Sequence, residues 1–272
     1  MEFATKNSGR FCFMFHSTIH AAICCAAICC AAIIAAVSLR ADSDPFASRA
    51  ERAFHEAQLR ARKEPTNTSA NVRFAQAAFE WAEFSGKDSE REDIALRGIE
   101  AARAAINREP NNAAAPYWLG MNLGQLARTK SLGALKLVHE MEDEFSRALT
   151  LDEHFDYAGP DRSLGLLYRD APGWPTSIGS KKKAREHLER AVKLHPEFPD
   201  NQLALLESFE KWADRQNFDR LLKACEAAMA EGKNKFTGPE WEASWADWNK
   251  RLREMKSKAA TVGKPLPSKG GK

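Results

Sequence analysis

The histidines are the side chains best suited to metal chemistry, but their spacing does not form a recognisable reactive site. His55 and His139 are each followed by Glu, yet neither is followed by a second His four residues further on. A zinc-protease helix needs both imidazoles on one face, one turn apart. His187 and His195 are eight residues apart, which is about two helical turns and too far for one metal ion. We therefore predict no metal site and no cofactor.

Motifs of the common enzyme classes are also missing from the sequence. It contains no Gly-x-Ser-x-Gly nucleophile elbow, no phosphate-binding glycine-rich loop and no Gly-x-Gly-x-x-Gly fingerprint. We therefore predict a protein that acts by binding and is not an enzyme.

One segment has the composition of a binding loop. Residues 170–179 contain two Pro, two Gly and Trp174. Pro172 and Pro175 restrict the backbone in advance, so fixing the loop against a partner costs less conformational entropy. Two interpretations stay open. Either this segment is a structural turn in which Trp174 fills a gap between helices, or it is a loop in which Trp174 binds a partner or ligand.

The elements that carry these residues are predicted to be helices. Of 272 residues, 45 are Ala, and beyond residue 41 only eight are Val or Ile. Ala loses no side-chain entropy in a helix, whereas β-branched residues fit the pleated surface of a sheet. This composition argues against Rossmann, barrel and sandwich folds. The length suits one large domain or an array of repeats.

A fourfold repeat indicates how the helices are arranged. Each copy begins with a small or flexible residue, and an apolar or small residue follows four positions later. Three positions after that comes Ala in most copies, and Pro follows this third residue by five. Copies begin at residues 53, 98, 141 and 184, which are 45, 43 and 43 residues apart. Steps of four and three stay on one helix face, where small residues admit a neighbouring helix. In the third copy Glu153 replaces Pro, and Leu164–Gly165 follows it by twelve residues instead of ten. This spacing predicts a two-residue insertion before the next helix.

The repeat resembles the tetratricopeptide repeat over roughly residues 46–231, most clearly in Gly98–Leu123 and Ala184–Pro196. Units of that family are 34 residues long, and here the extra residues fall between the two helices of each hairpin, where they would stack along one edge. The resemblance implies an all-α solenoid, a superhelix of elongated hairpins. We expect about ten helices in it, behind an N-terminal hydrophobic helix. It also implies a groove lined by the first helix of each hairpin. The residues predicted to line it are Gln76, Glu80, Tyr117, Gln125, Arg162, Arg169, Glu207 and Glu210.

A second resemblance concerns residues 162–191. The run from Arg162 to Gly179, continuing into Ala184–Ala191, resembles the T component of TRAP-type transport systems, the TatT family. This resemblance implies a periplasmic, non-enzymatic subunit that associates with a solute-binding protein and offers an apolar passage to a ligand. Two functions therefore stay open: a protein-interaction scaffold, and a carrier of a small apolar ligand. The candidate partner- or ligand-binding residues are Gln76, Tyr117, Gln125, Arg162, Tyr168, Arg169, Asp170 and Trp174.

Residues 1–41 are predicted to be separate from the folded body. Residues 11–39 contain no Asp, Glu, Lys or Arg, and such a run is long enough to span a membrane. A small-residue cleavage site at residues 36–38 makes a signal peptide the alternative to a membrane anchor. Either way we expect an exported protein of the periplasm or cell envelope. Five of the six Cys lie in this segment, and the body keeps only Cys225, so no intrachain disulfide is expected there.

Charge and aromatic spacing describe the rest of the chain. Residues 42–250 carry 30 basic and 35 acidic residues, a net charge of −5. A nucleic-acid-binding body would carry a basic stripe, so no nucleic-acid partner is predicted.

Trp241, Trp245 and Trp248 lie on one face of a predicted helix and predict a buried row of aromatic side chains, a seam. We expect the solenoid over residues 42–258, a capping helix over 238–258 and a disordered basic tail over 259–272.

Overall fold

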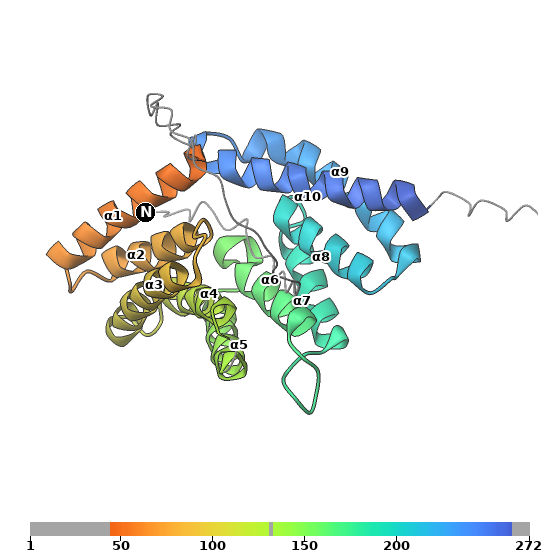
Figure 1. Ribbon diagram of the computed structural model, residues 1–272. Helices are drawn as coiled ribbons and strands as arrows, with labels where there is room; N and C mark the ends of the chain where they lie inside the picture. The colour runs from red at the N-terminus through yellow and green to blue at the C-terminus, as the bar shows by residue number, and fades with distance from the viewer. Residues whose placement is uncertain (1–43, 131–132, 263–272) are drawn as a thin grey trace, which may run out of the picture.

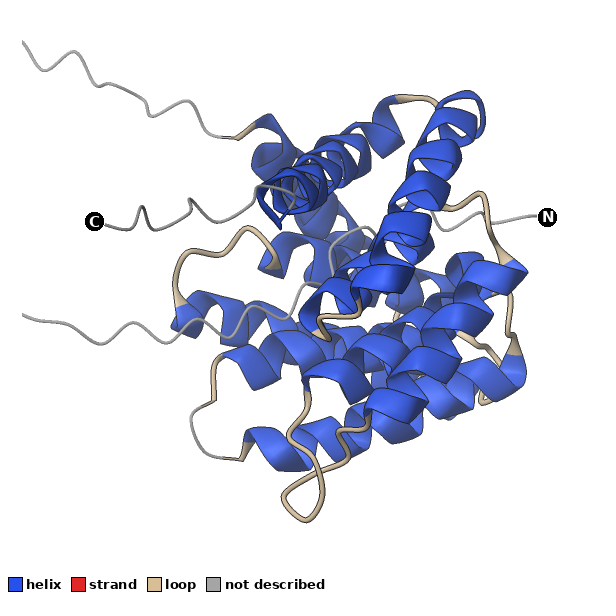
Figure 2. Cartoon of the chain, turned by 90° about the vertical axis from the view of Figure 1, so that its right-hand side faces the viewer, coloured by secondary structure: helices blue, strands red, loops and turns tan. Residues whose placement is uncertain are grey.

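The computed structural model describes residues 44–130 and 133–262, and these residues are predominantly helical (Figure 2). The predicted all-α fold is confirmed, since the described residues contain no strand. None of their helices has the length and apolar character needed to cross a bilayer. The predicted hydrophobic segment at residues 11–39 lies outside the described residues. The elements are α1 (Pro45–Lys63), α2 (Thr68–Ala82), α3 (Asp88–Arg108), α4 (Ala114–Arg128), α5 (Ala134–Leu151), α6 (Phe155–Asp170), α7 (Lys181–Leu194), α8 (Pro199–Lys211), α9 (Arg215–Lys235), the 3₁₀ turn η1 (Pro239–Trp241) and α10 (Glu242–Val262).

The helices pack as hairpins in chain order. α2 packs on α3, α4 on α5, α6 on α7 and α8 on α9, while α2, α4, α6 and α8 contact one another in sequence. The array curves from α1 through α5 to α8, and α9 runs back toward α1, so that α10 begins beside the start of α1 and runs away from it (Figure 1). The extra residues of each unit were predicted to fall between the two helices of a hairpin. Connections of this kind join α2, which ends at Ala82, to α3, which begins at Asp88, and α6, which ends at Asp170, to α7, which begins at Lys181.

Close helix crossings explain the small residues of the repeat. A Cβ added at Gly120 would lie 2.5 Å from the Phe145 ring, and one added at Gly165 would lie 2.5 Å from Cγ of Leu188. Both glycines belong to the first helix of a hairpin, and both partners belong to the second. The apolar–small pairs Leu119–Gly120 and Leu164–Gly165 therefore mark points where two helices approach closely.

The start of α6 contains an unusual backbone turn. Asp156, Tyr157 and Ala158 have φ values of 51°, 56° and 60°, so three successive non-glycine residues are left-handed. The left-handed helical conformation costs roughly 1–2 kcal/mol per residue. This turn lies where the repeat predicted a two-residue insertion.

The C-terminal end of the array is closed by α10, which packs on α8 and α9. Trp241 is 2% exposed and Trp248 is fully buried, in an aromatic cluster with Phe198 and Phe236. Trp245 is only partly buried, and its indole N–H donates to the Phe236 carbonyl at 2.7 Å. The α10 helix continues to Val262, and the last ten residues of the sequence lie outside the described range.

The burial of the seam predicts a ranking of two substitutions. Trp248→Ala removes a fully enclosed ring and should lower the free energy of unfolding by about 3–5 kcal/mol. Trp245→Ala should cost less, because part of that ring already contacts solvent. Chemical denaturation of both variants checks the order, and an equal or reversed ranking would contradict this assignment of the core.

Candidate functional site

The loop between α6 and α7 projects from the edge of the array and presents Trp174 with 89% of its surface exposed (Figure 1). The loop is held by its own backbone: Gly179 N–H donates to the Pro172 carbonyl at 2.8 Å. A Cβ at Gly179 would lie 2.1 Å from the Ala171 carbonyl oxygen, so only glycine fits this closure. Trp174 therefore does not fill a gap between helices. It is an exposed aromatic ring on an internally bonded support.

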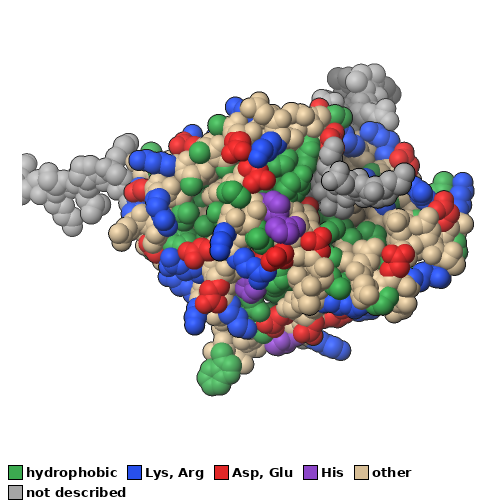
Figure 3. Space-filling view, turned by 180° about the vertical axis from the view of Figure 1, so that it is seen from behind, with side chains coloured by type: hydrophobic (Ala, Val, Ile, Leu, Met, Phe, Trp, Pro, Cys, Tyr) green, Lys and Arg blue, Asp and Glu red, His purple; other side chains and the backbone are tan. Residues whose placement is uncertain are grey.

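Basic side chains surround the base of this loop. Lys181, Lys182 and Lys183 follow it directly and begin α7. Lys183 Nζ lies 4.6 Å from the Tyr168 ring centroid and 3.6 Å from the Glu142 carboxylate, whereas the Lys182 side chain is 86% exposed. Seen from the back, the loop carries a hydrophobic side chain at its tip, and Lys and Arg side chains gather above it (Figure 3). The edge thus combines an apolar tip with a positive surface.

The predicted groove residue Arg162 lies in the interior of the array. Only 1% of it is exposed, and its guanidinium contacts the Asp156 and Asp200 carboxylates, each at 3.0 Å. It also donates to Asn201 Oδ1 at 2.8 Å and lies over the Phe198 ring at 5.2 Å. These partners come from the left-handed turn and from α8. Arg162 is therefore a bridge between neighbouring hairpins.

A second buried arginine extends the bridge to the capping helix. Arg251 of α10 donates to Asp200 at 2.5 Å and to both oxygens of Glu207, at 2.6 and 3.0 Å. Tyr117 of α4 is fully buried, and its hydroxyl donates to Asp156 at 2.8 Å. The chain Tyr117–Asp156–Arg162–Asp200–Arg251 thus connects α4, α6, α8 and α10. We call these five residues the inner charge network.

The other predicted groove residues are also bonded within the array. Gln76 is 2% exposed and donates to Glu80 at 2.8 Å, and Gln125 is 2% exposed and donates to Glu83. Lys258 of α10 pairs with Glu210 at 2.9 Å.

The candidate residues at the end of α6 are bonded in the same way. Tyr168 donates to Glu142 at 2.5 Å, and Arg169 pairs with Asp170 at 2.7 Å and contacts Ser208. Among the eight candidate site residues, Trp174 is the one that presents most of its surface to solvent.

Sequence reasoning missed most of the inner charge network. Asp156, Asp200 and Arg251 are absent from the predicted residues, because an argument from helix faces considers each helix separately. One signal was present: Tyr117 and Asp156 are 39 residues apart, and Arg251 and Glu207 are 44 apart, close to one repeat. Residues one repeat apart lie on neighbouring units, so complementary polar residues at that spacing indicate contacts.

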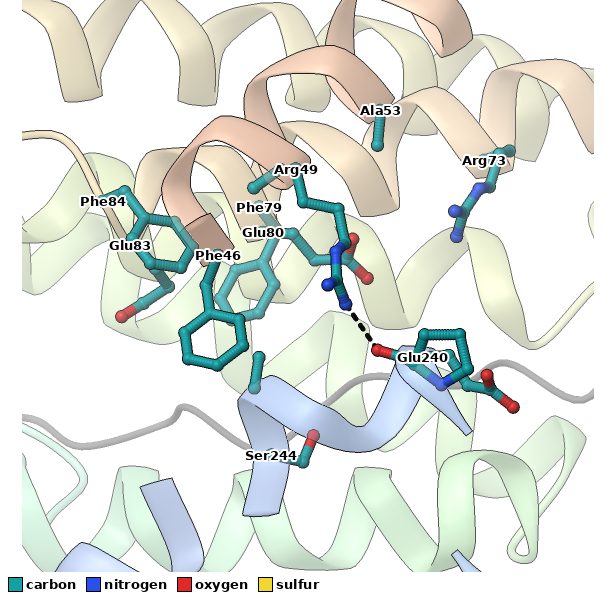
Figure 4. A pocket seen from close by; sticks show the side chains of 13 residues that line it. Phe46, Arg49, Ala53, Arg73, Phe79, Glu80, Glu83, Phe84, Glu240 and Ser244 are labelled. Carbon is teal, nitrogen blue, oxygen red and sulfur yellow. Dashed lines mark hydrogen bonds between the residues drawn. The ribbon is translucent and has the colours of Figure 1, made fainter. Parts of the chain in front are cut away.

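A pocket lies where the two ends of the array meet. It has a volume of about 180 Å³ and is lined by α1, α2, η1 and the start of α10 (Figure 4). Arg49 of α1 donates to the Pro239 carbonyl at 2.5 Å and to Glu242 at 2.8 Å, and so joins the ends. Burial raises the pKa of Glu80, on the pocket wall, to about 7, and the neighbouring Arg73 opposes this rise.

The described residues contain no cluster of three or more His, Cys, Asp or Glu that could hold a metal ion. His154 and His195 do approach each other, with 3.2 Å between Nδ1 and Nε2. Cys225 is buried, and this burial raises the pKa of its thiol to about 12. A thiol that is neutral and enclosed is a poor nucleophile at neutral pH.

Comparison with known proteins supports the fold. The family model for regulator of microtubule dynamics protein 1-3 matches residues 40–158, less than half of the chain. A thermophilic TPR protein of Thermus thermophilus is similar in structure, with a TM-score of 0.54 and 16% identity over 77% of this chain and 92% of that one. No curated protein matches. At this identity the similarity shows the fold alone: the chain is a tetratricopeptide-like α-solenoid. The resemblance to the TatT family stays a prediction.

Breaking the inner charge network should be costly. Arg162→Met leaves two buried carboxylates without their shared partner and should lower stability by about 3–5 kcal/mol. Arg103→Met is the matched control, because Arg103 pairs with Glu140 between α3 and α5 but is 55% exposed; exposed pairs contribute about 0–1 kcal/mol. Urea denaturation measures both. Equal losses would show that the Arg162 contacts are no stronger than a surface ion pair.

The raised pKa of Glu80 predicts a pH dependence of stability. The folded pKa of about 7 exceeds the ordinary value of 4.5, so the folded chain binds more protons between these pH values and gains stability as pH falls from 8 to 5. Glu80→Gln lacks this titration. The free energy of unfolding of Glu80→Gln, minus that of wild type, should therefore be larger at pH 8 than at pH 5 by about 2–3 kcal/mol. Denaturation at both pH values checks this, and a difference independent of pH would contradict it.

Proposed function

We propose that this protein is a protein-interaction scaffold that binds its partner through the edge at the α6–α7 loop, with Trp174 as the central contact. The observation that carries the proposal is the 89% exposure of Trp174 on a loop held by its own hydrogen bonds. Trp is enriched among the residues that dominate binding energy at interfaces. Because the loop is already ordered, little entropy is lost when a partner fixes it.

The pairing of the charged residues on the concave side supports the same conclusion. Tetratricopeptide-like arrays offer an extended concave surface, but here its central charges pair with one another. Arg162 and Arg251 are both committed to Asp200, and Glu207 is committed to Arg251. A partner would have to break buried ion pairs to reach these groups, whereas the side chains of Trp174 and Lys182 already face solvent.

The partner surface should be complementary to this edge. Trp174 requires an apolar recess, and the three lysines that begin α7 favour acidic residues around that recess. Opposite charges on two binding surfaces mainly increase the association rate and orient the partners. The scaffold would be held at a membrane by residues 11–39, which we propose as the anchor of an exported, envelope-associated protein.

The test uses the tagged full-length chain, solubilised with its native membranes in mild detergent, and identifies co-purifying proteins by quantitative mass spectrometry. Trp174→Ala should remove the main partner, and Lys182→Glu should weaken its retention. Leu59→Ala is the control, because Leu59 is another exposed large apolar residue, at 55%, on α1. A partner profile that is the same for Trp174→Ala and wild type would reject the site.

The second candidate is a TatT-like accessory subunit that associates with a periplasmic solute-binding protein and holds an apolar ligand. The feature that favours it is that the projecting loop belongs to the segment that carries this resemblance. Organic extraction of the purified protein, followed by mass spectrometry, separates the two functions. A stoichiometric apolar molecule supports the carrier, and an empty extract supports the scaffold.

A further inference from the structure

The pocket between α1, α2 and η1 has a divided lining. Phe46, Phe79 and Phe84 gather on one side of it, and the carboxylate of Glu80 lies toward Arg73 on the other (Figure 4). Its volume of about 180 Å³ is below the roughly 300–1,000 Å³ of pockets for drug-sized ligands. The pocket therefore suits an object the size of one side chain, with an apolar stem and a polar end.

The charges of the lining favour a cation at that polar end. Five ionisable residues line the pocket, two of them Arg and three Glu, so the lining has an excess of one negative charge. Two lining residues pair with charges outside the pocket: Arg49 with Glu242 at 2.8 Å, and Glu83 with Arg128 at 3.0 Å. These two outside charges cancel, so the excess of one negative charge in the lining remains.

Glu80 is the group best placed to receive such a cation. Its carboxylate accepts a hydrogen bond from the neutral Gln76 amide, at 2.8 Å, and among the described residues no Lys or Arg nitrogen lies within ion-pair distance of it. Arg73 acts on this carboxylate by charge without forming a contact ion pair, so a cation that reaches the carboxylate directly adds a contact that Arg73 does not make. The three Phe rings add apolar contact for the stem, and their faces attract cations.

We propose that this pocket binds a primary alkylammonium group of the size of a lysine side chain, with the ammonium on Glu80 and the methylene stem on Phe46, Phe79 and Phe84. The pocket is built from both ends of the array, α1 and α2 on one side and η1 with α10 on the other. A bound cation would therefore hold the two ends together. This site is separate from the Trp174 edge, so either can fail without the other.

The pH dependence of binding follows from the groups that face Glu80. These are Arg73 on α2, Arg49 on α1 and Glu240 on η1, with Asp156 acting at longer range. Since the pKa of Glu80 is raised to about 7, its carboxylate is mostly ionised at pH 8 and mostly protonated at pH 6. An ammonium group that binds the ionised form should bind about tenfold more weakly at pH 6 than at pH 8.

The experiment titrates full-length protein in detergent micelles with n-butylammonium chloride and follows ¹³C-labelled alanine methyl groups by NMR. Ala50, Ala53 and Ala243 line the pocket and report on it directly. n-Butanol and sodium n-butyrate are the matched neutral and anionic probes. We expect saturable shifts with butylammonium, at least tenfold weaker binding of the other two, and the loss of affinity at pH 6.

Two variants keep the result interpretable. Glu80→Gln should weaken butylammonium binding at least tenfold at pH 8 and abolish its pH dependence, while Ala53→Leu should fill the pocket and weaken binding at both pH values. Nα-acetyl-lysine methylamide distinguishes the source: tighter binding than butylammonium indicates a lysine of a peptide, and equal binding indicates a free amine. Equal binding of the three butyl probes, or wild-type affinity in folded Glu80→Gln, would overturn the proposal.

Discussion

Buried charge must be paired, and in this protein the pairing is made between repeats. Arg162 is almost inaccessible to water, and an isolated buried guanidinium would destabilise the fold by several kcal/mol. Its two carboxylate partners arrive from different elements, the left-handed turn at the start of α6 and the first turn of α8. The backbone strain of that turn persists because Arg162 and Asn201 hold it; Asn201 donates to the Tyr157 carbonyl at 2.9 Å.

This constraint determines which surfaces are available for binding. The residues that a tetratricopeptide-like groove would offer to a peptide are used here to attach α8 to α6 and α10 to α8. Two other surfaces remain open. One is the outer edge, where the insertions between paired helices lie and Trp174 projects, and the other is the small pocket where α1 meets η1. Both depend on the array being rigid, because a loop or pocket can be pre-ordered only if its supporting helices are fixed.

Much of the fold could be predicted from sequence because its cause is local. Gly120 and Gly165 mark close helix crossings, and this role follows from small residues at helical spacing. The lengths of the hairpins and the positions of the insertions followed from the same period. The predicted seam was largely right as well, with Trp241 and Trp248 buried and Trp245 only partly so.

The site was less predictable because its contacts are not local. The groove prediction placed Arg162 on the first-helix face but could not show that Asp156 and Asp200 would neutralise it, since that depends on a left-handed turn formed by three non-glycine residues. The pocket at Glu80 forms only because the first and last helices of the array lie side by side, and the spacing of the repeat does not predict that contact.

The central claim is that the charges of the inner face bind one another across repeats. A double-mutant cycle on Arg162→Met and Asp200→Asn, measured by equilibrium denaturation, tests it most directly. The account predicts that the double variant loses less stability than the sum of the single variants, by at least about 1 kcal/mol. Losses that add within about 0.5 kcal/mol would show that the two groups do not interact, and the inner charge network would not be what holds the repeats together.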